Sequence, residues 1–141
     1  MDTMLPIGSV VELEGVKEYV TIIGLLPSLI VDGKLVFYEY VGCNYLKGYR
    51  SADDYIYFDE SKITNVYFIG YALEFDFKLL ENLHEVYKEI DNGGTLEETI
   101  DRVIKKLYPD DINEKQELKK KILDYCFNNE PKKEQGEWYD G

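Results

Sequence analysis

The fold is decided by the stretch Tyr38-Glu-Tyr-Val-Gly-Cys-Asn-Tyr-Leu-Lys-Gly-Tyr49, which extends the longest predicted strand. It places four tyrosines, two glycines and one cysteine within twelve residues. A strand normally alternates apolar and polar residues and then ends at a turn. Here the tyrosines continue through and beyond the glycines. A tyrosine has a rigid apolar ring and a polar tip, which suits a half-buried surface. The stretch therefore indicates a binding surface rather than a catalytic centre.

Around this stretch, the first half of the chain has the pattern of β-strands. The longest predicted strand is 35–45, and an Asp-Gly pair at 32–33 is a strong signal for a hairpin before it. Further short strands, rich in apolar and β-branched residues, are predicted at 7–13, 19–26, 55–58 and 63–71. A single helical turn is expected at 59–62. These segments predict a curved antiparallel sheet of four to six strands.

The second half has helical periodicity, with apolar residues three and four positions apart. The first predicted helix starts near Asp76 and ends at 91–94, where asparagine and glycine favour a C-cap. Thr95-Leu-Glu-Glu98 is a capping box that starts a second helix, and Tyr108-Pro109 ends it. A third helix is expected between Asp111 and Pro131. The fold class that follows is α+β, with three helices packed on the sheet.

The length of 141 residues fits one domain with a sizeable core. We predict a single α+β domain over 1–130, with a β-rich part at 4–72 and a helical part at 76–130. The polar tail, 131–141, is predicted to be mobile. It contains the aromatic pair Trp138-Tyr139, whose role the sequence leaves open: a docking peptide, or rings that fold back or stay in solvent.

The composition narrows the classes of function. The formal net charge is −12, and phosphate backbones are bound by clustered lysines and arginines, so no nucleic-acid partner is expected. No stretch of about 18 apolar residues occurs, so membrane insertion is not expected. The N-terminus, with Asp2 and Pro6, lacks the basic region of a secretory signal. Cys43 and Cys126 lie in unlike segments, which indicates two free thiols in a reduced, cytoplasmic protein.

The residue types that carry catalysis are sparse. His84 is the only histidine, and its place at the edge of a helical stripe predicts a surface or boundary position. The chain has no metal-ligand spacing such as HExxH or CxxC, and no glycine-rich phosphate motif. We therefore predict no catalytic, metal-binding or cofactor-binding residue, and not an enzyme. A small enzyme with a glycosidase-like acid pair remains an alternative.

Several motifs of the N-terminal half resemble a small bacterial family, number 4176 among the domains of unknown function. The motifs are Met4-Leu-Pro-Ile-Gly-Ser-Val-Val11, Ile22-Ile-Gly24, Tyr38-Glu-Tyr-Val-Gly-Cys43, Tyr45-Leu-Lys-Gly-Tyr49 and Val66-Tyr-Phe-Ile-Gly-Tyr71. Members of that family look like cytosolic companions of LXG-type toxins in Gram-positive type VII secretion clusters. The resemblance implies a targeting chaperone or adaptor that binds a secreted toxin before export. It implies no catalytic residue.

The predicted function is therefore protein binding, with a secreted toxin as the partner. By period-two alternation, Tyr38 and Tyr40 are expected to share one strand face, and Tyr45 and Tyr49 to lie in the turn beyond it. The predicted partner-binding residues are Tyr38, Tyr40, Tyr45, Tyr49 and Tyr71. An immunity protein, which neutralises a toxin by covering its active site with acidic surface, is the main alternative. The oligomeric state stays open.

Overall fold

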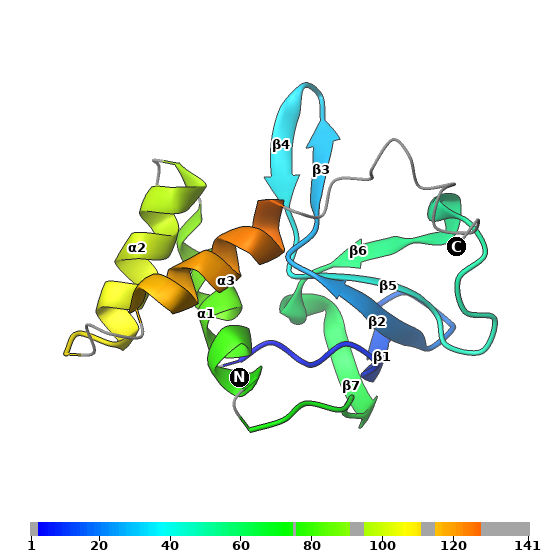
Figure 1. The fold of residues 1–141 in the computed structure, drawn as a ribbon. Coiled ribbons are helices and arrows are strands. Elements are labelled where there is room, and N and C mark those ends of the chain that lie inside the picture. Colours follow the sequence, from blue (N-terminus) through cyan, green and yellow to red (C-terminus); the bar gives the residue numbers. More distant parts are fainter. Residues whose placement is uncertain (1–2, 75, 91–94, 111–114, 128–141) are drawn as a thin grey trace, which may run out of the picture.

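A five-stranded antiparallel sheet is formed by the first half of the chain, in the order β6-β5-β2-β1-β7 (Figure 1). The computed structural model describes residues 3–74, 76–90, 95–110 and 115–127. The strands are β1 (Val10–Leu13), β2 (Val20–Leu25), β5 (Tyr40–Asn44), β6 (Ile56–Phe58) and β7 (Ile63–Phe68). The sheet and the helices that follow it confirm the predicted α+β class.

A separate two-stranded ribbon, β3 (Ser28–Val31) with β4 (Lys34–Phe37), projects away from the sheet (Figure 1). Its turn is the predicted Asp-Gly pair, with positive φ at Asp32 (52°) and Gly33 (78°). Both central residues of a type I′ hairpin turn need positive φ, and this pair of residue types tolerates it. The hairpin prediction is confirmed.

The predicted continuous strand 35–45 is wrong, because the chain leaves strand geometry at residues 38–39. Leu26 has a left-handed backbone, with φ 51°, and Pro27 follows it, so the chain turns out of the sheet after β2. After the ribbon, residues 38–39 return alongside residues 26–27. The Leu26 amide donates to the Glu39 carbonyl, and the Tyr38 amide donates to the Pro27 carbonyl, both at 2.9 Å. The longest predicted strand is therefore divided into β4 and β5.

Three helices follow the sheet: α1 (Asp76–Glu89), α2 (Leu96–Leu107) and α3 (Lys115–Phe127). Thr95 is the N-cap of α2, as predicted, since the Glu98 amide donates to the Thr95 hydroxyl at 3.1 Å; the reciprocal bond of a capping box, from the Thr95 amide to the Glu98 side chain, stays a prediction. In the described parts of the chain, no helix has the length and apolar character that crossing a bilayer requires. The predicted C-cap at 91–94, the start of the third helix at Asp111, its end at Pro131, and the tail with Trp138-Tyr139 lie outside the described residues.

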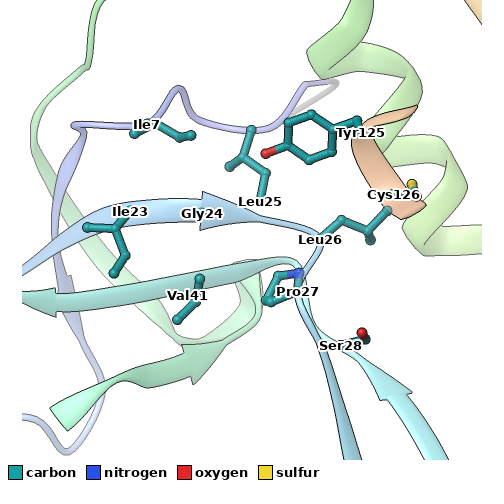
Figure 2. A pocket seen from close by; sticks show the side chains of 10 residues that line it. All are labelled: Ile7, Ile23, Gly24, Leu25, Leu26, Pro27, Ser28, Val41, Tyr125 and Cys126. Atoms are coloured by element: carbon teal, nitrogen blue, oxygen red, sulfur yellow. The ribbon is translucent and has the colours of Figure 1, made fainter. Parts of the chain in front are cut away.

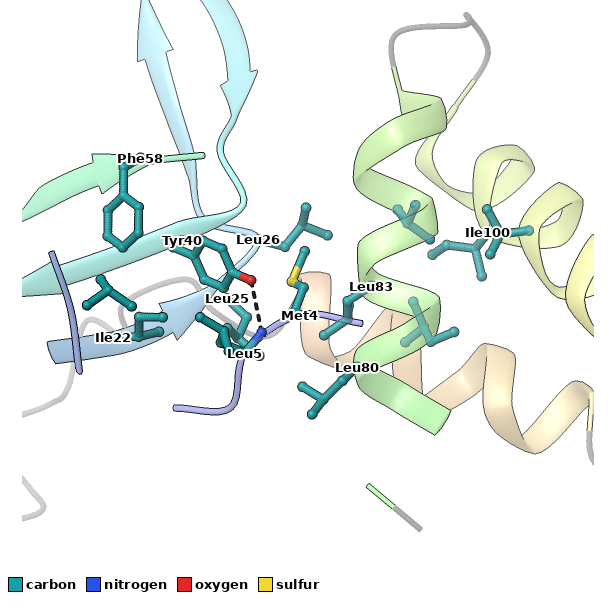
Figure 3. Close-up of a cluster of buried hydrophobic side chains, with 14 of the residues drawn as sticks. Met4, Leu5, Ile22, Leu25, Leu26, Tyr40, Phe58, Leu80, Leu83 and Ile100 are labelled. Atoms are coloured by element: carbon teal, nitrogen blue, oxygen red, sulfur yellow. Dashed lines mark hydrogen bonds between the residues drawn. The ribbon is translucent and has the colours of Figure 1, made fainter. Parts of the chain in front are cut away.

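One hydrophobic core joins the sheet to the helices (Figure 3). Leu80, Leu83 and Val86 of α1 are buried in the same cluster as Val11, Val20 and Ile22 of the sheet. The N-terminal segment lies between the two parts, with Met4 and Leu5 directed into the core (Figure 3). The Met4 amide also donates to the Leu80 carbonyl at 3.3 Å. Helix α1 therefore completes the core that the sheet begins.

Candidate partner-binding surface

The face of the sheet that points away from this core carries tyrosine rings. Strand β2 shows the alternation, because Val20 and Ile22 are buried while Thr21 between them is partly exposed. Seven tyrosines around this outer face are linked by ring contacts. We call them the tyrosine face: Tyr19, Tyr38, Tyr45, Tyr49, Tyr55, Tyr57 and Tyr67.

The first group of the tyrosine face surrounds Tyr19. The Tyr19 ring stacks on Tyr67, with centroids 4.6 Å apart, and lies 5.7 Å from Tyr45. Glu12 of the neighbouring strand accepts hydrogen bonds from the Tyr67 hydroxyl at 2.8 Å and from Asn65 Nδ2 at 2.9 Å. The hydrogen bond from Tyr67, supported by that from Asn65, lowers the pKa of the Glu12 carboxyl. A charged carboxylate therefore lies at the edge of this aromatic group, bonded to Tyr67.

The second group lies toward β6. The Tyr49 ring is 5.7 Å from Tyr55, Tyr55 is 6.5 Å from Tyr57 in an edge-on arrangement, and Tyr57 is 5.8 Å from Tyr38. Each aromatic pair of this kind contributes about 0.5–1.5 kcal/mol. The contacts hold the rings in one arrangement before any partner binds, which reduces the entropy lost on binding.

The turn after β5 places two of these rings. Asn44 Oδ1 accepts hydrogen bonds from the amides of Leu46 and Lys47, both at 2.9 Å, and Gly48 has a positive φ of 68°. An asparagine that bonds to its own following backbone is typical of a tight turn. Tyr45 lies in this turn and Tyr49 directly follows it, 50% and 65% exposed. The prediction that they lie beyond the strand is confirmed.

Tyr40, predicted to bind a partner, is instead fully buried in the core. Its ring stacks on Phe58 at 5.4 Å, and its hydroxyl accepts a hydrogen bond from the Leu5 amide at 2.9 Å (Figure 3). Tyr38 lies on the tyrosine face and is partly exposed. The expectation that residues 38 and 40 share a face is wrong, because the bend at 38–39 breaks the alternation between them.

Tyr71 lies beyond the end of β7 and is 83% exposed. Among the described residues, its ring takes part in none of the aromatic contacts. Sequence reasoning missed Tyr19, Tyr55, Tyr57 and Tyr67. The spacing of two between Tyr55 and Tyr57, in the segment predicted as a short strand, was a usable signal. The stacking of Tyr19 on Tyr67 was not, because it depends on the pairing of distant strands.

A hollow of about 480 Å³ lies where the end of α3 meets the base of the ribbon (Figure 2). Ile23 and Val41 line it from the sheet, and Tyr125 and Cys126 from α3. None of the described residues that line it is charged. Burial raises the pKa of the Cys126 thiol to about 11. The Cys126 thiol is therefore protonated at neutral pH.

Both cysteines are free thiols, as predicted, and burial also raises the pKa of Cys43. With a pKa of about 11, Cys126 is about 0.1% thiolate at pH 8, against about a quarter for an ordinary thiol. We expect 5,5′-dithiobis(2-nitrobenzoate) to react at least about tenfold more slowly with the native chain than with the chain unfolded in guanidinium chloride. Equal rates, or fewer than two thiols in the unfolded and unreduced chain, would contradict this.

A polar cluster lies on the core side, between the sheet and α1. His84 is only 3% exposed, so the predicted surface or boundary position is wrong. Its Nδ1 lies 3.5 Å from Oε2 of Glu39, and Glu39 is 5% exposed. Burial raises the pKa of Glu39, although the Glu60 amide and His84 oppose this shift. Among the described residues, Glu39, Glu60 and His84 form a group whose oxygen and nitrogen atoms could hold a metal ion.

Comparison with known proteins assigns the β-rich half to a family. Among curated proteins and among solved structures, no match to the chain was found. The family model described as Domain of unknown function (DUF4176) matches residues 4–79. That segment contains the whole sheet, the ribbon and the start of α1, and it includes all seven residues of the tyrosine face. Because the match covers more than half of the chain, this protein belongs to the DUF4176 family.

Proposed function

We propose that this chain is a non-catalytic chaperone or targeting adaptor that binds an LXG-type toxin in the cytosol, before export by a type VII secretion system. The observation that carries the proposal is the tyrosine face, a preorganised aromatic surface on the open side of the sheet. The class of partner comes from the resemblance of about residues 4–75 to companions of such toxins. The rest of the proposal comes from the chemistry of the surface.

The tyrosine face has the character of a protein-binding site. Tyrosine offers a large contact area with few rotatable bonds, and it is enriched among the residues that dominate binding energy at interfaces. Tyr45, Tyr49 and Tyr67 are each at least half exposed. Ionised Glu12 and the net charge of −12 favour a partner segment with basic residues near its apolar contacts.

The test compares paired substitutions in binding and in stability. Tyr45→Ala combined with Tyr49→Ala should weaken binding of the cognate toxin by about 2 kcal/mol or more, which is about 30-fold in the dissociation constant. The thermal midpoint should fall by only a few degrees, because both rings are at least half exposed and each loses one aromatic contact. Binding of the purified toxin is measured by calorimetry, and stability by thermal melting.

Tyr71→Ala is the matched control, since it removes an exposed tyrosine that lies off the tyrosine face. If Tyr71→Ala has the larger effect on binding, the interface lies at the end of β7 instead. A large drop in thermal midpoint in the double variant would assign the two rings to the fold. Unchanged binding would place the interface elsewhere.

The same complex separates the chaperone from the immunity alternative, which the charge of −12 favours because an acidic surface can cover a basic active site. A chaperone should leave the catalytic activity of the bound toxin intact and should be needed for its export. Loss of toxin activity on binding, with export unaffected, would support the immunity protein.

A further inference from the structure

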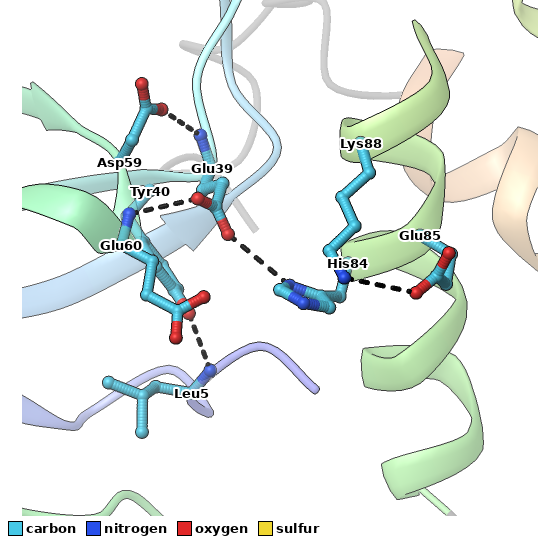
Figure 4. A network of polar contacts seen from close by, with 8 residues as sticks. All are labelled: Leu5, Glu39, Tyr40, Asp59, Glu60, His84, Glu85 and Lys88. Atoms are coloured by element: carbon cyan, nitrogen blue, oxygen red, sulfur yellow. Dashed lines mark hydrogen bonds and ion pairs between the residues drawn. The ribbon is translucent and has the colours of Figure 1, made fainter. Parts of the chain in front are cut away.

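Glu39, Glu60 and His84 come together from three segments that lie far apart in the chain (Figure 4). Glu39 lies at the bend before β5, Glu60 begins the 3₁₀ turn η2 (Glu60–Lys62), and His84 lies in α1. Each side chain offers one ligand atom, and the three atoms lie within 4.8 Å of one another. The cluster therefore bridges the β-rich half and the first helix.

Backbone hydrogen bonds hold Glu39 in position. Asp59 Oδ1 accepts from the Glu39 amide at 3.1 Å, and Glu39 Oε1 accepts from the Glu60 amide at 2.9 Å (Figure 4). The first bond holds the Glu39 backbone, and the second fixes Oε1 of its carboxylate, which leaves Oε2 facing His84. Outer hydrogen bonds of this kind orient the ligands of metal ions in proteins.

The atoms that face one another in this cluster are buried and unsatisfied. In the part of the chain that the structure describes, neither Glu39 Oε2 nor either ring nitrogen of His84 has a hydrogen-bond partner. Buried polar groups are normally hydrogen-bonded, and buried charges are paired or coordinate metals. An ion pair between Glu39 and His84 would require a protonated imidazole and would use only two of the three groups.

We propose that Glu39, Glu60 and His84 bind one divalent transition-metal ion of the zinc class. One imidazole nitrogen with two carboxylate oxygens suits zinc, whereas calcium and magnesium prefer oxygen ligands alone. Zinc–ligand distances of about 2.0–2.2 Å place tetrahedral ligand atoms about 3.4 Å apart. The 3.5 Å between His84 Nδ1 and Glu39 Oε2 already matches that spacing.

The third ligand needs only a small movement. One ligand atom of Glu60 lies within 4.8 Å of a ligand atom of each of the other two residues, so a side-chain adjustment of Glu60 brings it to the same ion. An open hollow of about 570 Å³, lined also by Ser61 and Lys88, adjoins the cluster and has room for a water ligand in the fourth position. A bound ion would join α1 to the bend before β5 and so stabilise the junction of the two halves.

Zinc chloride is the probe for this site, added to the tag-free full-length chain in excess magnesium after treatment with a chelator. We expect one zinc ion per chain by calorimetry and a raised thermal midpoint. Because His84 is the only histidine, a chain labelled with ¹⁵N-histidine gives one set of ring signals. The Nδ1 signal should change to that of a metal-bound nitrogen, while Nε2 stays protonated.

Two variants that each remove one negative charge distinguish zinc binding at this site from general attraction of zinc to acidic residues. Glu60→Gln changes a partly exposed ligand and should fold, but should bind zinc at least about tenfold more weakly. Glu85→Gln, next to His84 on α1, should bind zinc as the unchanged chain does. Equal zinc binding by both variants, no binding at micromolar zinc, or unchanged His84 ring signals would overturn the proposal.

Discussion

A chain that ends at residue 74 should lose cooperative folding, because the helices that complete the core are absent. Leu80, Leu83 and Val86 of α1 are buried against the sheet side of the core. Each such side chain contributes about 1.5–3 kcal/mol when fully buried. The burial of three such side chains contributes a free energy comparable to the net stability of a typical domain, about 5–15 kcal/mol. The shortened chain should show no sharp transition in guanidinium chloride and weak near-ultraviolet circular dichroism.

The matched control for this truncation ends at residue 127 and keeps α1, α2 and α3. It should unfold in one cooperative transition close to that of the full chain. If the shorter chain also unfolds cooperatively, the sheet is a domain that folds without the helices. The core between β1, β2 and α1 would then be an interface between domains rather than a shared core.

Tyr40→Ala should destabilise the chain by about 3–5 kcal/mol, because it leaves a cavity in place of a fully buried aromatic ring. Tyr40→Phe keeps the ring and removes only the hydroxyl that accepts from the Leu5 amide. A buried amide without its acceptor costs about 1–3 kcal/mol. Both values would be measured as changes in the free energy of unfolding in guanidinium chloride.

Tyr71→Phe is the control for Tyr40→Phe, since it removes a hydroxyl from a ring that is exposed. It should change the free energy of unfolding by less than about 0.5 kcal/mol. If Tyr40→Phe is as stable as the unchanged chain, the hydrogen bond to Leu5 contributes nothing to stability. If Tyr40→Ala is also neutral, Tyr40 is not the core residue described above.

The features that the sequence predicts correctly are those set by neighbouring residues. The Asp32-Gly33 turn and the Thr95 cap need only local backbone preferences. The helical stripes are also readable, because apolar residues recur with the period of a helix. The break at 38–39 is not readable, because it follows from the left-handed backbone of Leu26 and from hydrogen bonds across the base of the ribbon.

The candidate sites depend on contacts between distant segments, which explains why they were only partly predicted. Tyr45 and Tyr49 follow from the turn after the strand, whereas Tyr19 and Tyr67 meet only because β1 lies between β2 and β7. His84 lies at the edge of a helical stripe, a position that is compatible with exposure. Its burial becomes visible only when Glu39, 45 positions earlier, is placed against α1.

The ribbon formed by β3 and β4 has a further consequence, for how members of the family can diverge. Leu25 pairs with Tyr40, and the Leu26 amide bonds to the Glu39 carbonyl. The pairing of β2 with β5 is therefore complete before the ribbon begins. Insertions, deletions or replacement of the ribbon should therefore leave the register of the five strands unchanged. Its outward Ile30 and Leu35 are strongly exposed. A change in the length of this arm should therefore leave the sheet and its core the same.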